Sequence, residues 1–405
     1  MVREAGMEMH EARRRAGRLA MACLLVAGVL LGCGGGGGHA DSTQATPTAL
    51  SPSQPGVLAI SSSMRLDPFP STPDQYLAVA EEAVDLSYSA GARGQMTTYT
   101  WKKLEPTQGS YDAKEWNGLD WWMTQSQKRS QVNYIGIQLI NTTQREMPAG
   151  LDVLAFDNAQ VKARFHALLD KLIGLYKGRI QYLSIGNEVD VYLRAQAKAG
   201  DEQWAAYQRF YEDVVAYVHQ LDPAIKVGVT ATFDGALGPS LTQVKALNAQ
   251  SDVLILTYYP LQYDAVTYAV SVRDPSVVPG DFQRMLAWAG ARPLVLQEVG
   301  YPASSVNIKS SEQMQAAFVR QVFAAWSQSA SASLAQAEQP IPFLNFFLLH
   351  DFSARDCETF TSYYGAGNIP GFGDFLCSLG LRKTDGTPRA AWSTLIDEAK
   401  KASLP

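Results

Sequence analysis

The sequence contains little of what metal sites and nucleic-acid surfaces require. It has four cysteines and five histidines in 405 residues, without the Cys-x-x-Cys or His-x-x-x-His spacing of zinc ligands. We therefore expect no structural zinc site. Basic residues do not outnumber acidic ones, at 34 against 39, and the net charge is −5. Because binding to phosphates requires a basic face, we expect no nucleic-acid partner.

The apolar run at residues 19–31 is too short to span a bilayer, which takes about 20 apolar residues. Four arginines precede it between positions 13 and 18, and it ends in Leu30-Leu31-Gly32-Cys33. This pattern resembles a bacterial lipoprotein signal, so we predict that residues 1–32 are removed and that Cys33 carries lipid. The alternative is an ordinary signal peptide with a chance cysteine.

Residues 33–56 are rich in Gly, Ser, Thr, Pro and Gln and hold too few apolar side chains to form a core. We interpret them as a disordered tether, so the lipid would be the sole membrane contact. The predicted location is the bacterial cell envelope, outside the cytoplasm. The outer membrane or the cell surface is favoured, because Gly34 after Cys33 offers no acidic retention signal.

The remaining cysteines, Cys357 and Cys377, lie twenty residues apart in a glycine-rich stretch. Cys23 would leave with the leader. In an oxidising compartment a pair of this kind most often forms a disulfide, and we predict one here.

No second linker interrupts residues 57–401, so we predict one large domain. Within it, eight short apolar runs alternate with stretches of helical period. Near-continuous apolar strands between amphipathic helices indicate a parallel sheet covered by helices, and a count of eight predicts an α/β fold closed as a (β/α)₈ (TIM) barrel. The alternative is an open doubly wound sheet, but no glycine-rich phosphate turn follows the first run. The runs are residues 57–60, 94–99, 132–140, 180–186, 226–232, 253–258, 293–296 and 343–349.

Helix-capping signals support this alternation. Thr72-Pro73 is typical of an N-cap followed by proline in the first turn. Ser310 with Gln313 matches a capping box, and Asp222-Pro223 marks the end of a helix just before a predicted strand.

Two glutamates stand where predicted strands end. Glu188 follows the fourth run in Gly186-Asn187-Glu188, and Glu298 follows the seventh in Gln297-Glu298-Val299. Active sites of such barrels form at the carboxyl ends of the strands. Two carboxylates across one barrel mouth suit the hydrolysis of an acetal, where one protonates the leaving oxygen and the other attacks or stabilises the anomeric carbon.

These motifs resemble glycoside hydrolase clan A. The resemblance covers most of residues 57–400 and includes Ile185-Gly186-Asn187-Glu188 and Leu296-Gln297-Glu298. The stretch Thr257-Tyr258-Tyr259-Pro260, with Glu298-Val299-Gly300-Tyr301-Pro302, is similar to the β-1,4-galactanase and β-1,3-glucanase families and, more broadly, to cellulase-like families. The resemblance implies a retaining mechanism with Glu188 as acid/base and Glu298 as nucleophile.

The resemblance also implies substrate-binding residues. Asn187 would contact the sugar 2-hydroxyl, and a tyrosine after the sixth strand would hydrogen-bond the nucleophile. We prefer Tyr258 for that role over Tyr259, and Arg93 is a candidate for similar electrostatic support.

Aromatic residues at or just past strand ends are candidates for stacking on sugars. They are Tyr99, Trp101, Tyr301 and Phe352. His350 closes the eighth run where the clan often has a tryptophan, so we include it among the substrate-binding residues. A weaker hypothesis makes His350, Asp351 and Asp234 a metal site.

The sequence thus predicts a monomeric enzyme that hydrolyses β-linked glycans without metal or organic cofactor. The alternative function is a non-catalytic, surface glycan-binding lipoprotein on the same barrel. The sugar, the linkage and the choice between internal and terminal cleavage are set by loop shapes that the sequence does not reveal.

Overall fold

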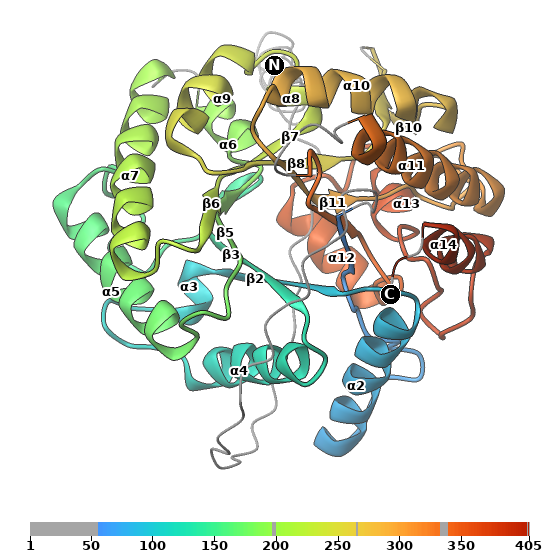
Figure 1. The fold of residues 1–405 in the computed structure, drawn as a ribbon, viewed down its shortest axis with the longest axis horizontal. Coiled ribbons are helices and arrows are strands. Elements are labelled where there is room, and N and C mark those ends of the chain that lie inside the picture. Colours follow the sequence, from blue (N-terminus) through green and yellow to red (C-terminus); the bar gives the residue numbers. More distant parts are fainter. Residues whose placement is uncertain (1–55, 197–199, 265, 333–338, 403, 405) are drawn as a thin grey trace, which may run out of the picture.

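A computed structural model describes residues 56–196, 200–264, 266–332, 339–402 and 404. Within these residues, parallel strands at eight positions form a ring (Figure 1). The ring order is β6-β5-β3-β2-β1-β12-β11-β8-β7. The strands are β1 (Val57–Ile60), β2 (Gly94–Thr100), β3 (Val132–Asn141), β5 (Tyr182–Asn187), β6 (Lys226–Gly228), β7 (Thr230–Thr232), β8 (Leu254–Tyr258), β11 (Leu294–Val299) and β12 (Phe343–Phe346).

The ring closes through one interrupted strand. β6 and β7 are separated by Val229 alone; β6 pairs with β5, and β7 pairs with β8. At the opposite side, β1 pairs with both β12 and β2. Because the first strand has a neighbour on each side and the order returns on itself, the predicted barrel is confirmed and the open doubly wound sheet is excluded.

An outer ring of helices surrounds the strands, as Figure 1 shows. In the described part of the chain it consists of α2 (Pro73–Ser89), α4 (Ala113–Lys128), α5 (Ala159–Leu175), α7 (Gly200–Leu221), α9 (Leu241–Leu247), α10 (Val278–Ala289), α11 (Glu312–Ala332) and α14 (Ala390–Lys401). Each strand position of the ring is followed by one of these helices, which is the (β/α)₈ pattern.

Shorter elements lie in the loops, and all but one of them, η1, follow a strand. They are α3 (Trp101–Leu104), β4 (Gln144–Arg145), α6 (Val189–Ala195), α8 (Phe233–Ala236), η1 (Asn248–Gln250), β9 (Leu261–Tyr263), β10 (Val270–Val272), η2 (Pro275–Val277), α12 (Ala354–Tyr363) and α13 (Phe372–Leu376). Loops after strands build the active-site face of a barrel, so all of these elements except η1, which follows α9, shape the mouth.

The capping signals are confirmed at α2 and corrected at α11. Thr72 caps α2 by accepting from the backbone N–H of Gln75 at 3.2 Å. At α11 the N-terminal contact comes from Ser311, whose hydroxyl accepts from the N–H of Met314 at 3.1 Å. Ser310 instead donates to the carbonyl of Pro302 at 2.5 Å. The predicted capping box was wrong by one residue because Ser310 belongs to the preceding loop.

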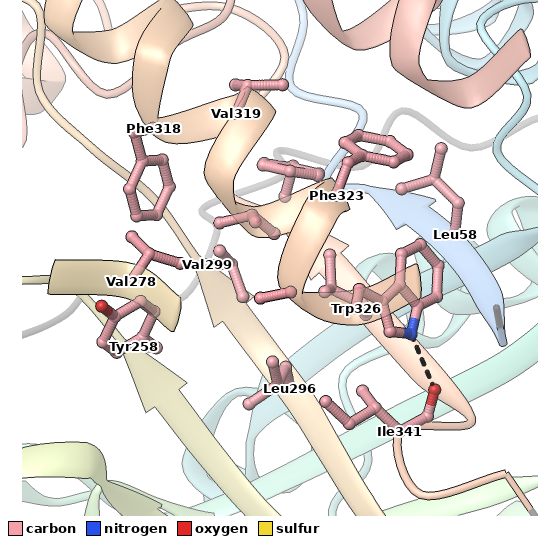
Figure 2. Close-up of a cluster of buried hydrophobic side chains, with 14 of the residues drawn as sticks. Leu58, Tyr258, Val278, Leu296, Val299, Phe318, Val319, Phe323, Trp326 and Ile341 are labelled. Atoms are coloured by element: carbon pink, nitrogen blue, oxygen red, sulfur yellow. Dashed lines mark hydrogen bonds between the residues drawn. The ribbon is translucent and has the colours of Figure 1, made fainter. Parts of the chain in front are cut away.

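A large apolar core lies between the strands and the outer helices. Figure 2 shows α11 placing Phe318, Phe323 and Trp326 over β11, whose Leu296 and Val299 point toward them. The indole N–H of Trp326 donates to the carbonyl of Ile341 at 2.9 Å, so its one polar atom is satisfied. Burying each such side chain contributes roughly 1.5–3 kcal/mol, and this layer holds the strand ends in place.

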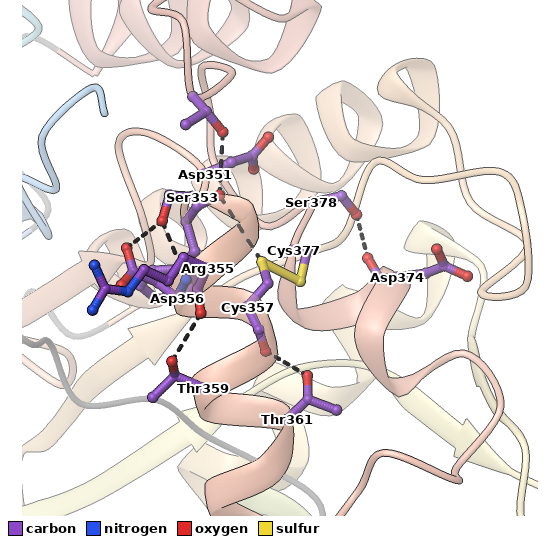
Figure 3. The surroundings of a disulfide bond; sticks show 12 residues. Asp351, Ser353, Arg355, Asp356, Cys357, Thr359, Thr361, Asp374, Cys377 and Ser378 are labelled. Carbon is purple, nitrogen blue, oxygen red and sulfur yellow. Dashed lines mark hydrogen bonds between the residues drawn. A yellow bond between two sulfur atoms is a disulfide. The ribbon is translucent and has the colours of Figure 1, made fainter. Parts of the chain in front are cut away.

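The predicted disulfide is present between Cys357 and Cys377, with their Cα atoms 5.8 Å apart (Figure 3). It joins α12 to the end of α13, within a segment that follows the last strand. We call residues 353–378 the cap segment. The leader, Cys33 and nearly all of the predicted tether lie outside the described residues, and no helix in the described part has the length and apolarity to cross a membrane.

Candidate active site

Glu188 stands where β5 ends and α6 begins. Its backbone is left-handed, with φ 46° and ψ 46°, a conformation that costs a non-glycine residue about 1–3 kcal/mol. Gly186 also has a positive φ, 89°, and a Cβ atom there would lie 2.5 Å from the hydroxyl of Tyr207. This tight turn requires glycine and places the Glu188 side chain at the end of the strand.

Two threonine hydroxyls fix the carboxylate of Glu188. Thr142, which follows β3, donates to Oε2 at 2.9 Å, and Thr257 of β8 donates to Oε1 at 2.6 Å. The residue is 0% exposed. Each carboxylate oxygen therefore has a partner in place of the water it has lost.

Glu298 lies near the carboxyl end of β11, next to an irregularity in the strand. The pairing with β8 shifts between Leu296 and Glu298, which leaves Gln297 as an extra residue. A bulge re-aims side chains, and here it turns both Gln297 and Glu298 toward the barrel interior. Tyr259 donates to Oε2 of Glu298 at 3.0 Å, and Gln297 donates to Oε1 at 3.1 Å.

The side-chain amide of Gln297 connects the two glutamate motifs. Its Nε2 donates to Oδ1 of Asn187 at 2.7 Å as well as to Glu298. Its Oε1 accepts from the hydroxyls of Tyr134 and Thr230. A fully satisfied buried amide holds one rotamer, so Gln297 fixes the strand ends of β5 and β11 relative to each other.

Burial raises the pKa of both carboxyl groups. Hydrogen bonds lower the pKa of both groups, from Thr257 and Thr142 at Glu188 and from Gln297 and Tyr259 at Glu298, but the charge of Glu298 raises the pKa of Glu188 further. Two buried carboxyl groups that feel each other's charge cannot both ionise easily. The pair therefore holds a proton near neutrality, and that proton resides preferentially on Glu188.

The structure brings four predicted site residues together: Glu188, Glu298, Asn187 and Tyr259. Asn187 is fully buried, and its Nδ2 donates to Oδ1 of Asn141 at 3.1 Å.

Our preference for Tyr258 over Tyr259 was wrong. The hydroxyl of Tyr258 donates to Asp281 at 2.8 Å, and its ring packs against Phe282. Successive side chains of a strand point to opposite faces, so Thr257 and Tyr259 face the interior while Tyr258 faces the helices.

Arg93 was also assigned wrongly. It precedes β2, so it lies at the amino end of that strand, away from the face that carries the glutamates. Its guanidinium donates to the carbonyl of Tyr88 at 2.8 Å and lies 4.0 Å from the centre of the Tyr88 ring. Proximity to the strand in sequence did not reveal which end of the barrel the side chain occupies.

Trp101 and Tyr301 are packed in the core and present no face to a sugar. Trp101 is 0% exposed, donates to Glu105 at 2.9 Å and meets Phe165 edge to face. Tyr301 stacks on Phe318, and its hydroxyl donates to a backbone carbonyl of the loop after β10 at 2.8 Å. Their position just past a strand end reflects packing under the loops.

The contacts of His350 also indicate a structural role. Its Nδ1–H donates to the carbonyl of Ser63 at 2.7 Å, and its Nε2 accepts from Arg382 at 3.1 Å. Burial lowers the pKa of His350 to about 4, so the ring is neutral. It joins the loop after β1 to the turn before α14, which contradicts its assignment to the substrate-binding set.

The weaker metal hypothesis finds no support in the geometry. Asp351 accepts from the guanidinium of Arg389 and from the N–H of Gly380 at 2.8 Å. In the described ranges, His, Cys, Asp and Glu side chains form no group of three or more placed to hold a metal ion.

The cap segment lies close to the two carboxylates, where Phe375 of α13 meets Tyr259 edge to face. Tyr364, just after α12, is buried, and the charges of Glu188 and Glu298 add to burial in raising the pKa of its hydroxyl. Its ring meets those of Tyr363 and Phe372. Glu298 is only 1% exposed.

A recess of about 100 Å³ lies among the residues that follow β1 and β12, strand β2 and the cap segment, and neither glutamate lines it. Tyr99 and Phe352, both predicted to stack on sugars, line it, together with Trp122 and the loop after β1. These two aromatics therefore reach a cavity, whereas Trp101 and Tyr301 do not.

Several residues of the site were missed from the sequence. Thr142, Thr257 and Asn141 contact Glu188 or Asn187, and Gln297 joins the two motifs. The rule that selected the glutamates by their position at strand ends could have found them, because all four lie among the last residues of a strand or directly after it. Uncharged threonine, asparagine and glutamine side chains do not by themselves indicate a catalytic role.

No family model matches this sequence, and no curated protein matches it. Solved structures do match the fold. They include an exo-β-1,4-mannosidase from Opitutaceae bacterium strain TAV5, with 14% identity and a TM-score of 0.58 over 86% of this chain and 59% of the mannosidase chain. A family 5, subfamily 18 glycoside hydrolase (GH5_18) from Bifidobacterium longum subsp. infantis has 16% identity and a TM-score of 0.59 over 86% and 79%.

A β-glucosidase from Exiguobacterium marinum has 10% identity and a TM-score of 0.57, over 87% of this chain and 99% of the glucosidase chain. At such low identities the likeness concerns the fold. The chain shares the (β/α)₈ barrel fold of these glycoside hydrolase structures, the fold that the sequence resemblance implied.

Proposed function

We propose that this protein hydrolyses β-O-glycosidic bonds by a retaining double displacement. The observation that carries the proposal is the pair of buried glutamates, Glu188 and Glu298, delivered by β5 and β11 into one hydrogen-bonded centre. Glycosidases use two such carboxyl groups on either side of the scissile bond. The similar structures, all glycoside hydrolases by name, support the proposal at the level of fold.

The environments of the two groups assign their roles. Both carboxyl groups accept two hydrogen bonds that lower their pKa, so these bonds do not distinguish them, whereas the charge of the partner raises the pKa of Glu188 and not that of Glu298; we therefore take Glu298 as the nucleophile. The charge of Glu298 keeps the proton on Glu188, so Glu188 is the general acid. Different environments give two glutamates different protonation states at one pH.

In the first step, Glu298 Oε2 or Oε1 attacks the anomeric carbon while Glu188 gives its proton to the leaving glycosidic oxygen. The bond to that oxygen breaks, and an ester forms between the sugar and Glu298. In the second step, Glu188, now a carboxylate, takes a proton from water, which attacks the anomeric carbon and releases Glu298. Both steps use only groups of the chain, the sugar and water.

Asn187 remains our candidate for the sugar 2-hydroxyl, since it lies next to Glu188 and is held by Asn141 and Gln297. We also propose that Cys33 anchors the protein in the cell envelope.

The test is a panel of β-linked glucans, galactans, mannans and xylans with the wild type and with Glu298→Gln and Glu188→Gln. Glu212→Gln is the matched control, because Glu212 lies on α7 and pairs with Gln208 at the outer surface. We expect the control to match the wild type. Both site variants should lose at least 1,000-fold in kcat, which corresponds to an activation free energy higher by about 4 kcal/mol. Full activity of Glu298→Gln on a substrate that the wild type cleaves contradicts the assignment.

A non-catalytic glycan-binding protein is the second candidate. The observation that favours it is the burial of both carboxylates, Glu188 at 0% and Glu298 at 1% exposed. Binding of a glycan from the panel without any release of reducing ends would support it.

A further inference from the structure

Gln138 of β3 has a buried side-chain amide in the wall of the barrel. The residue is 1% exposed, and neither Oε1 nor Nε2 of the amide has a hydrogen-bond partner within the described residues. Buried polar groups of native proteins are nearly always hydrogen-bonded, so an amide that is unpaired through both of its polar atoms needs an explanation. A ligand that brings a donor and an acceptor of its own would provide one.

The pairing of β3 with β2 fixes the direction of the Gln138 side chain. This pairing is regular over residues 132–138, so side chains alternate between the two faces of β3 as far as Gln138. Tyr134 faces the interior, because its hydroxyl donates to Gln297 of β11 across the barrel. Gln138 stands four positions further along on the same face, whereas its neighbour Ile137 belongs to the apolar cluster between the strands and the outer helices.

On β3, Gln138 stands between two residues that contact the surroundings of the glutamates. Four positions before it, Tyr134 bonds to the residue next to Glu298. Four positions after it, Thr142 donates to Glu188 at 2.9 Å. The amide of Gln138 therefore lies on the part of the barrel wall that connects the surroundings of the two carboxyl groups.

Other buried amides near the glutamates have partners. Nδ2 of Asn187 donates to Asn141 at 3.1 Å, and its Oδ1 accepts from Gln297 at 2.7 Å. Asn345 of β12 donates through Nδ2 to the carbonyl of Gln297 at 2.9 Å and leaves only Oδ1 unpaired within the described residues. In this same part of the chain, Gln138 keeps both a donor and an acceptor available.

We propose that Gln138 is a substrate-binding residue whose amide holds hydroxyl groups of the sugar. A hydroxyl can both donate and accept, so it can pair with either atom of the amide. The proposal rests on the proposed function and adds to it a residue that recognises the substrate. A site built to bond a hydroxyl discriminates strongly against an analogue that lacks it, because the polar groups of the site are then left unpaired.

Gln138→Met separates a binding role from a structural one. Methionine is similar in size, and the change breaks no hydrogen bond that the structure describes, so the Tm should equal or exceed that of the wild type. The probes are cello-, manno-, galacto- and laminaripentaose. On the pentasaccharide that the wild type cleaves, kcat/KM should fall about tenfold or more. A lower Tm, or a variant that does not fold, would mean that the amide has a structural partner and overturns the proposal, as does an unchanged kcat/KM.

Gln125→Met is the matched control. Gln125 is a buried glutamine of the outer helix α4, 3% exposed, and its Oε1 accepts from Arg129 at 2.9 Å. Because its amide has a partner and lies outside the barrel, the control should lower Tm and leave kcat/KM unchanged. The same chemical change is thus expected to have opposite effects at the two positions.

Deoxy analogues identify the hydroxyl that Gln138 holds. Phenyl β-glycosides of the sugar that the wild type prefers, each lacking one of its hydroxyl groups, are compared on the wild type and Gln138→Met. Removing the hydroxyl that Gln138 holds should lower kcat/KM of the wild type about tenfold and that of the variant by less than about threefold, because the variant has already lost this bond. Equal losses in both proteins for every analogue would mean that Gln138 contacts no hydroxyl of the substrate.

Failure of this proposal can be told apart from failure of the proposed function. If the wild type cleaves a probe and Gln138→Met matches it, only the role of Gln138 is wrong. If the wild type binds the probes and cleaves none, the proposed function fails, and Kd from calorimetric titration replaces kcat/KM with the same expectations for Gln138. If the wild type neither binds nor cleaves any of the four pentasaccharides, both are overturned.

Discussion

The hydroxyl of Tyr259 donates a 3.0 Å hydrogen bond to Oε2 of Glu298. Its neighbour Tyr258 makes an equivalent bond to Asp281 on the outside of the barrel, at 2.8 Å. Two adjacent tyrosines thus have the same chemistry on opposite faces of one strand, which provides a matched pair of variants.

Tyr259→Phe removes a hydrogen bond to the carboxylate that we propose as nucleophile. A hydrogen bond to a charged group contributes about 1.5–3 kcal/mol, so kcat should fall about 10- to 100-fold. Loss of that bond also raises the pKa of Glu298, which shifts the acidic limb of the pH profile of kcat/KM upward. Tyr258→Phe should change the free energy of unfolding and leave the pH profile of kcat/KM unchanged. Identical profiles for all three proteins would remove Tyr259 from the mechanism.

Glu188→Gln should stabilise the protein at alkaline pH. Burial and the charge of Glu298 raise the pKa of Glu188 in the folded state above its unfolded value. A group with a raised folded pKa contributes stability at low pH, and this contribution is lost as the pH rises through the folded pKa. The melting temperature of the variant relative to the wild type should therefore be higher at pH 9 than at pH 5. A difference that is the same at both pH values would mean that Glu188 ionises normally.

The disulfide should protect the cap segment against local opening. Closing a loop of about 15 residues by a cross-link stabilises a chain by roughly 3 kcal/mol in the entropic account, and Cys357 and Cys377 are 20 residues apart. Replacing both cysteines by serine should make residues 353–378 the first site of limited proteolysis, at least tenfold faster than in the wild type. A reducing agent should produce the same effect in the wild type and none in the double variant. Unchanged cleavage in the double variant would show that the loop contacts alone hold the segment.

The predicted leader can be tested by lipid labelling. Cys33→Ala should abolish incorporation of labelled palmitate when the full chain is expressed in a Gram-negative bacterium, and the protein should leave the membrane fraction. Cys23→Ala, ten residues earlier in the same predicted leader, serves as the control and should label normally. Labelling that survives Cys33→Ala would disprove the lipid attachment.

The sequence determined the strands, the helices and the two glutamates. Buried parallel strands must be apolar along their whole length, and helices must carry an apolar stripe. The alternation of strands and helices could therefore be recognised in the sequence, and it predicted a barrel. The strand-end positions of Glu188 and Glu298 followed from the same pattern, since carboxyl ends of parallel strands share one face.

The tertiary structure alone decided which of their neighbours take part. Tyr258 and Tyr259 differ by one residue, and the pleat of β8 sends one outward and the other to Glu298. Trp101 and Tyr99 both stand near a strand end and both are buried in the core, and only Tyr99 also lines a recess. The position of the cap segment depends on contacts between loops more than 60 residues apart, such as Tyr363 with Glu146, and no local pattern in the chain encodes such contacts.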